Sequence, residues 1–109
     1  MLPLRQAIEA FLQRLSVLKN ASLHTIRNYR LDLERFMLYL KEKRHFKEEE
    51  TLLSLPLDRK AIRGYLALLH EDGLSKKTAA RHLSSLRSFF KYALLEGLLL
   101  EDPTEEIDH

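Results

Sequence analysis

Apolar residues recur at steps of three and four along most of this chain, and no useful length alternates with period two. Steps of three and four place apolar side chains on one face of an α-helix, whereas a half-buried strand needs period two. The 109 residues are 45% hydrophobic and 31% charged, which is the composition of one foldable domain. The pattern therefore predicts an all-α bundle around a single core.

Residues that begin and end helices divide the chain into four predicted helices, at about 3–19, 22–44, 58–73 and 75–97. Side chains that can accept a hydrogen bond from the opening amides stand before the last three: Ser22, Asp58 and Ser75. Gly73 and Gly97 supply the left-handed conformation that commonly ends a helix. Residues 45–57 lack a sustained period and include three consecutive glutamates, so we expect a solvated connection with a short helical turn around 50–54.

The net charge of +2 hides an uneven distribution along the chain. Residues 96–109 carry six acids and no base, which leaves +8 on residues 1–95. A basic body of this kind favours an acidic partner such as nucleic acid. The absence of cysteine excludes disulfides and thiolate chemistry and agrees with a reducing compartment, so a cytoplasmic location is expected. No apolar run approaches the ~20 residues that span a bilayer, so no membrane partner is expected.

The predicted fourth helix separates into an apolar and a basic face. At about 100° per residue, the side chains on the apolar face are Ala79, Leu83, Leu86, Phe90 and Ala93. Those on the opposite face are Lys77, Arg81, Ser84, Ser88 and Lys91, with Thr78 and Ser85 at its flank. Cations separated by small hydroxyl residues let a helix backbone approach DNA phosphates. The alternative is an ordinary solvated face, but residues 75–95 hold five bases and no acid, which favours nucleic acid.

The first half of the second helix carries a matching polar set: His24, Thr25, Arg27, Asn28 and Arg30. Asparagine and arginine can read adenine and guanine edges in a major groove. For this set taken alone the structural interpretation is favoured, because Thr25 can support the helix cap and Arg30 can pair with Glu34 one turn later. Leu31 and Leu38 lie off the main apolar stripe, and we expect them to be buried against the first helix or residues 45–57 rather than to form a partner site.

Other residue types point to no chemistry. The five histidines, at 24, 45, 70, 82 and 109, have no metal-ligand spacing. There is no glycine-rich phosphate loop and no nucleophile turn, so we expect no cofactor, no metal and no catalysis from this chain alone.

Two segments resemble the N-terminal core-binding domain of tyrosine recombinases, in particular the Xer and phage-integrase type. The first segment, residues 73–92, reads GLSKKTAARHLSSLRSFFKY and is followed by Gly97 and Asp102-Pro103. The second, residues 22–36, reads SLHTIRNYRLDLERF and is similar to the second helix of that domain. The family more often has Asn-Pro where this chain has Asp102-Pro103.

The resemblance implies a four-helix orthogonal bundle, a SAM-like core-binding domain, that forms half of a C-shaped clamp on a recombination half-site. In that family the second and fourth helices face the major groove of double-stranded DNA. The positions of this chain that match the contact segments are Thr25, Arg27, Asn28, Lys76, Lys77, Thr78, Arg81, His82 and Ser85. Lys77, Arg81 and Arg27 rank above His82 and Ser85 among these candidates. His82 can instead be a plain helix-surface residue, and Ser85 can be there because it is small.

The resemblance also implies that the catalytic machinery lies in a second domain for which this chain has no residues. Residues 1–100 are then the DNA-binding domain, and residues 101–109 begin the linker to the catalytic domain. Expected partners are that catalytic domain and recombinase subunits in a synaptic tetramer, with the isolated domain monomeric. The alternative function is a helical protein-interaction module that does not bind DNA.

Overall fold

The computed structural model describes residues 2–47, 49–54 and 57–107. This part of the chain contains helices α1 (Leu4–Val17), α2 (Leu23–Lys43), α3 (Arg59–Glu71) and α4 (Lys76–Leu95), and the 3-10 helix η1 (Leu52–Ser54). The described residues form no β-strand, only one isolated bridge between Pro3 and Thr51. The all-α prediction is therefore confirmed. In the same residues, no helix is long and apolar enough to cross a membrane.

The helix ends lie close to their predicted positions because local side chains determine them. The side chains of Ser22, Asp58 and Ser75 accept hydrogen bonds from the amides of Thr25, Ala61 and Thr78 at 3.1, 2.9 and 3.1 Å. Each bond satisfies a donor that has no partner inside its own helix. Gly73 and Gly97 have φ values of +84° and +74°, which a side chain would make unfavourable.

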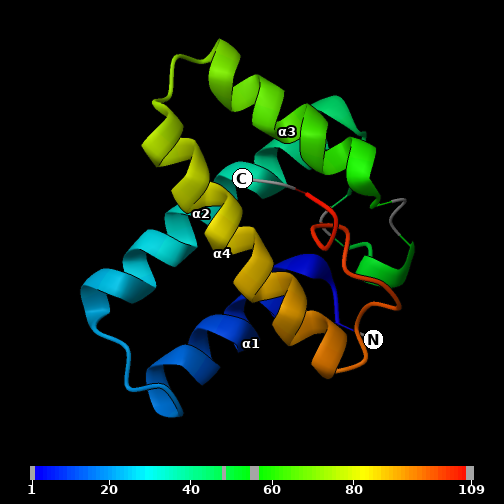
Figure 1. Ribbon diagram of the computed structural model, residues 1–109. Helices are drawn as coiled ribbons and strands as arrows, with labels where there is room; N and C mark the ends of the chain where they lie inside the picture. The colour runs from blue at the N-terminus through cyan, green and yellow to red at the C-terminus, as the bar shows by residue number, and fades with distance from the viewer. Residues whose placement is uncertain (1, 48, 55–56, 108–109) are drawn as a thin grey trace.

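Helix α4 is the common packing partner of the other three helices. It contacts α1, α2 and α3. In Figure 1 it runs across α1 and α2, and α3 lies at the top of the view, at the end of the molecule away from α1. Aromatic rings continue the contact through the core. The ring centroids of Phe11 and Phe89 are 5.6 Å apart, and those of Phe36 and Phe90 are 5.9 Å apart. These edge-on pairs join α1 and α2 to adjacent positions of α4.

The connection between α2 and α3 is less solvated than the sequence predicts. Phe46 and Leu52 are buried in the core, and the amide of Leu4 donates a 3.1 Å hydrogen bond to the carbonyl of Glu50. The prediction of a wholly solvated connection is therefore wrong. The short turn expected around 50–54 is present as η1, while residues 48 and 55–56 lie outside the described residues.

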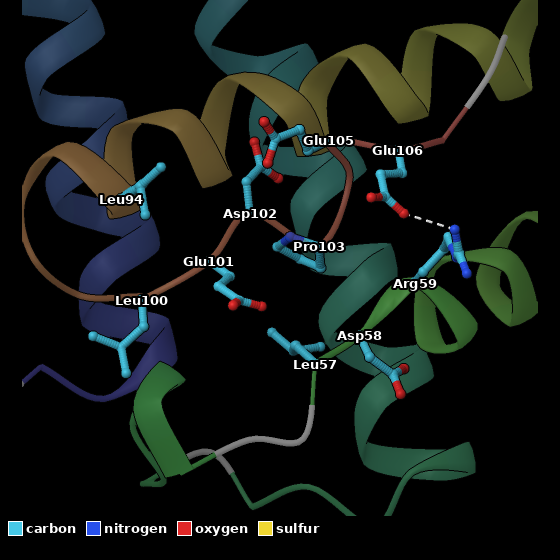
Figure 2. Close-up of a pocket in the computed structure, with 10 residues that line it drawn as sticks. All are labelled: Leu57, Asp58, Arg59, Leu94, Leu100, Glu101, Asp102, Pro103, Glu105 and Glu106. Atoms are coloured by element: carbon cyan, nitrogen blue, oxygen red, sulfur yellow. Dashed lines mark hydrogen bonds and ion pairs between the residues drawn. The ribbon is translucent and has the colours of Figure 1, made fainter.

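The segment after α4 packs on the helical body as far as residue 107. Leu99, Thr104 and Ile107 are buried, and Arg87 donates a hydrogen bond to the carbonyl of Ile107. Figure 2 shows this segment between α4 and the start of α3, where Arg59 Nη1 lies 2.7 Å from Glu106 Oε2. The division at residue 100 remains a prediction, but the described residues beyond it are part of the folded body.

Candidate nucleic-acid interface

The first turns of α2 and α4 are built in the same way. In each, a serine cap accepts a hydrogen bond from the amide of a threonine three residues later. The hydroxyls of Ser22 and Thr25 are 3.0 Å apart, as are those of Ser75 and Thr78. Thr25 and Thr78 therefore support the caps, which agrees with the structural interpretation of Thr25. They position the two helix N-termini whose polar faces the sequence singles out.

A groove between α2 and α4 brings together polar side chains that are about fifty residues apart in the chain. It encloses about 210 Å³ and is lined by Thr25, Asn28, Tyr29, Asp32, Arg81, Ser84 and Ser85. Four of these, Thr25, Asn28, Arg81 and Ser85, are among the nine candidate contacts. We refer to this feature as the α2/α4 groove. It combines the polar faces of both helices at one place on the surface.

Asp32 is the buried carboxylate beneath this groove. Its side chain is 1% exposed, and Arg81 Nη2 and Ser85 Oγ each donate a 2.7 Å hydrogen bond to it, on Oδ1 and Oδ2 respectively. His82 Nε2 lies 3.5 Å from Oδ1. A buried carboxylate needs such partners, because an unpaired charge inside a protein is strongly unfavourable.

His82 extends this network to α3. Its Nδ1 lies 3.3 Å from the hydroxyl of Tyr65, on the side of the ring away from Asp32. Burial lowers the pKa of His82, Asp32 acts in the opposite direction, and Arg81 and Arg35 lower the pKa further. Burial also raises the pKa of Tyr65, so its phenol stays protonated. The network therefore connects α2, α3 and α4 with neutral rings on one side and an ion pair on the other.

His82 and Ser85 do not lie on an exposed face. Each is 5% exposed, and both point into the contact between helices rather than toward solvent. The interpretation of His82 as a plain helix-surface residue is wrong, because its ring is held between Tyr65 and Asp32. In the described structure these two side chains lie against Asp32 and leave little of their own surface for contact with a ligand.

The remaining candidates lie outside the α2/α4 groove. Arg27 and Lys77 are exposed, and in the part of the chain that the structure describes neither has an ion-pair or hydrogen-bond partner. Lys76 lines a separate hollow beside α3, together with Leu66, His70 and Leu74. Lys76 is therefore apart from the other candidates, because one residue of helix turns its side chain about 100° away from that of Lys77.

Several arginines of the basic body are already paired. Arg30 forms an ion pair with Glu9 of α1, and its hydrogen bond to that carboxylate is the main cause of its raised pKa. The expected pair of Arg30 with Glu34 contributes only a smaller charge effect. Arg14 pairs with Glu96 at 2.6 Å and Arg35 with Asp72 at 2.9 Å. The cations left for a ligand are fewer than the charge count suggests.

Leu31 and Leu38 are about half exposed, at 52% and 50%. They line a hollow of about 390 Å³ whose other lining residues are Asp32, Glu34, Arg35, Arg81 and His82. The predicted burial against α1 or residues 45–57 is therefore wrong. The two leucines lie beside the α2/α4 groove on the same side of α2.

Asp32 is a residue of this site that the sequence pattern did not single out, whereas Tyr65 was expected only as a packing residue of the third helix. The signal for Asp32 was present, because it follows Tyr29 by three residues and precedes Phe36 by four, which is the spacing of the apolar stripe. A carboxylate at a buried position of a helix requires a cation or hydroxyl partner. Which residues of another helix provide it cannot be read from one helix alone.

The hollow beside the C-terminal segment is acidic. It encloses about 440 Å³ and is lined by five carboxylates, from Asp58, Glu101, Asp102, Glu105 and Glu106, with Arg59 as its one cation (Figure 2). Such a lining repels phosphate. Among the described residues, no group of three or more His, Asp or Glu side chains could hold a metal ion.

The family model described as the phage integrase N-terminal SAM-like domain matches residues 8–97. Tyrosine recombinase XerC of Chlamydia pneumoniae is 36% identical, over 93% of this chain and 36% of that protein. XerD of Listeria innocua is also 36% identical, over 93% of this chain and 32% of its own length. XerC of Halalkalibacterium halodurans is 38% identical, over 90% and 30%. The chain thus spans about a third of these relatives, and no solved structure gave a significant match.

Proposed function

The chain belongs to the phage integrase N-terminal SAM-like domain family, and from that membership we propose that it binds double-stranded DNA as half of a clamp on a recombination half-site. Helices α2 and α4 face the major groove in this proposal. The observation that carries it is the α2/α4 groove, where Thr25 and Asn28 of one helix lie beside Arg81 and Ser84 of the other. Asparagine and arginine are suited to base edges, and hydroxyls to phosphates.

The charges around the groove support the same assignment. Lys77 lies on the exposed face of α4, four residues before Arg81 and one helical turn away. Arg27 adds a second exposed cation on α2. Exposed cations without a carboxylate partner release counterions when they meet phosphates, so DNA binding should weaken steeply with added salt.

The proposal distinguishes contact residues from supporting residues. Lys77, Arg81, Arg27 and Asn28 contact DNA. Thr25 and Thr78 hold the helix N-termini at the backbone, and His82 and Ser85 act through Asp32. Lys76 contributes charge from the edge of the surface.

The proposal extends to the intact protein. We propose that a catalytic domain follows residues 101–109, cuts and rejoins DNA, and acts with other recombinase subunits in a synaptic tetramer in the cytoplasm. The isolated domain is then a monomer. These parts rest on the relatives, whose names identify them as tyrosine recombinases.

An amide-shift titration tests DNA binding. The isotopically labelled 109-residue chain is titrated with a short duplex of arbitrary sequence at low salt, and we expect shifts in residues 23–30 and 75–91. Lys77→Gln should weaken binding and reduce the slope of log affinity against log salt by about 1, because one phosphate contact is lost.

The matched control is Lys60→Gln, which removes the same charge from an exposed position of α3. It should leave the salt slope nearly unchanged. Absence of any shift in residues 75–91 at low salt would refute DNA binding. Equal effects of the two substitutions would show general charge attraction without a defined interface.

The half-exposed Leu31 and Leu38 favour one second candidate, a protein-interaction surface on α2. A protein partner held by these leucines would bind with little dependence on salt, since burial of apolar surface drives such contacts. Replacing both leucines with glutamine should abolish that binding and leave the DNA titration intact. Loss of DNA binding in the same variant would instead place the leucines at the DNA interface.

A further inference from the structure

We infer that Arg81, held by the buried carboxylate of Asp32, is the residue that determines base preference by reading a guanine edge, whereas Lys77 supplies attraction to phosphate. Asp32 is then a positioning residue. This inference rests on the proposed DNA binding and assigns different tasks to two cations one helical turn apart on α4.

Arg81 and Lys77 differ in the charge that they present to a ligand. The guanidinium of Arg81 is paired at 2.7 Å with a carboxylate that is 1% exposed, so the pair adds little net charge to the surface. Attraction to phosphate depends on unpaired cations that release counterions from DNA. Lys77 is such a cation in the described structure, and Arg81 is not.

The guanidinium of Arg81 also keeps donors that can reach a base edge. The side chain of Arg81 is 52% exposed, while one Nη2 hydrogen is used by Asp32. Arginine carries five N–H donors in a rigid plane, so four remain after this bond. Guanine presents two acceptors, O6 and N7, to a bidentate arginine in the major groove. A guanidinium held in place before binding loses less conformational freedom on forming that pair.

The residues around Arg81 are polar and hold its ion-pair partner in place. Asn28, Thr25 and Ser84 line the same groove and present hydrogen-bonding groups rather than further cations. Ser85 donates a hydrogen bond to the second oxygen of Asp32, and His82 Nε2 lies 3.5 Å from the oxygen that Arg81 bonds. The carboxylate therefore cannot follow Arg81 outward, and the ion pair fixes the direction in which the guanidinium points.

The test compares three variants of the full 109-residue chain. Lys77→Gln removes the proposed phosphate contact. Arg81→Lys keeps the charge and the partner of Asp32 but lacks the planar fork that reads guanine. Asp32→Asn keeps the shape and a hydrogen-bond partner for Ser85 but frees the charge of Arg81. Far-UV circular dichroism and thermal melting confirm that each variant is folded at the assay temperature.

Two measurements are made on each protein. The salt slope of affinity is measured on an arbitrary duplex, and base preference is measured by selection from a pool of duplexes with a randomised central segment. Wild type should enrich guanine at one or more positions, with replacement of that guanine lowering affinity roughly 5- to 150-fold. Arg81→Lys should keep the salt slope and lose the guanine preference.

Asp32→Asn gives the most informative result. Removing the carboxylate should steepen the salt slope by about 1, because Arg81 becomes an unpaired cation, while the guanine preference weakens. A purely structural role of Asp32 would lower stability without moving the slope in this direction. Lys77→Gln should reduce the slope by about 1 and keep the guanine preference.

Two outcomes overturn the inference while leaving DNA binding in place. One is an unchanged guanine preference in Arg81→Lys, and the other is an Asp32→Asn slope no steeper than that of wild type. A wild-type chain that binds no duplex at low salt refutes the proposed function itself.

Discussion

Gly64 on α3 lies where that helix approaches Tyr39 of α2. A Cβ atom added to Gly64 would stand 2.6 Å from Tyr39 Oη, closer than such atoms approach in real structures. The phenol cannot move freely, because it is buried and its hydroxyl donates a 2.8 Å hydrogen bond to the carbonyl of Ala61. We therefore expect that Gly64→Ala does not stabilise the fold and can lower its free energy of unfolding, although alanine is the better helix former.

The expected magnitude follows from three contributions. Alanine in a helix interior favours folding by about 1 kcal/mol relative to glycine. Loss of the Tyr39 hydrogen bond costs about 0.5–1.5 kcal/mol, and forcing the ring about 30° off its rotamer costs a further ~0.5–1.5 kcal/mol. The net effect of Gly64→Ala on the free energy of unfolding is thus between no change and a loss of about 2 kcal/mol.

A double-mutant cycle with Tyr39→Phe isolates the close approach. Without the hydroxyl, the nearest atom to the new Cβ is Tyr39 Cζ at 3.7 Å, an ordinary contact. Gly64→Ala should then stabilise the Tyr39→Phe background by about 1 kcal/mol, which gives a coupling of about 1–3 kcal/mol between the two positions. Urea unfolding followed by circular dichroism measures all four proteins. Equal stabilisation in both backgrounds would show that Tyr39 does not require glycine at position 64.

Three further predictions concern stability. Burial lowers the pKa of His82, which faces Asp32 and Arg35 of α2, Tyr65 of α3 and Arg81 of its own helix. As the pH falls, the unfolded chain takes up the proton before the folded chain does, so the free energy of unfolding should decrease below about pH 6.5, by at most ~1.4 kcal/mol per pH unit from this group. Urea unfolding should show a weaker pH dependence of stability in His82→Gln than in wild type. An unchanged pH dependence in that variant would contradict this cause. Ser75→Ala should lose about 1 kcal/mol of unfolding free energy through the lost cap, while Ser84→Ala, on the exposed face of the same helix, should change little. Phe90→Ala should lower the free energy of unfolding by about 3–5 kcal/mol, because this side chain is buried in the core. The exposed control Leu95→Ala should change it by no more than about 0.5 kcal/mol. Similar losses from both variants would contradict the packing of α4.

The helix ends could be predicted because the interactions that determine them are local. Ser22, Asp58 and Ser75 each bond to an amide three residues later, and Gly73 adopts a conformation that depends on its own backbone. The apolar period likewise belongs to single segments. Order, type and approximate length of the helices therefore follow from the sequence.

The interior of the candidate site could not be predicted in the same way. Asp32 is separated from Arg81 and Ser85 by about fifty residues, and the pairing depends on how α2 and α4 cross. A helical wheel of α4 alone places Ser85 at the flank of the polar face, yet α2 covers it. The wheel also places Arg81 on the surface as a free cation. On that basis alone, Arg81→Glu would be expected to leave the fold intact. The structure predicts that Arg81→Glu lowers stability instead, because the new carboxylate would replace the cation that pairs with the buried carboxylate of Asp32.

Phe46 and Leu52 illustrate a different limit. Phe46 stands alone among polar residues and Leu52 is followed by Leu53, but their segment has no sustained period that would mark either residue as part of the core. Both are nevertheless buried, and the hydrogen bond from Leu4 to Glu50 fastens their segment to the start of α1.

The position of α4 at the end of the helical order determines when this core can close during synthesis. Because α1, α2 and α3 all pack on α4, a ribosome that has released only the first three helices exposes apolar faces without their common partner. At about 5–20 residues per second, adding the length of α4 takes roughly 1–4 s. During that interval the apolar faces of α1, α2 and α3 lack their common partner, so folding is completed only after residue 95 has emerged.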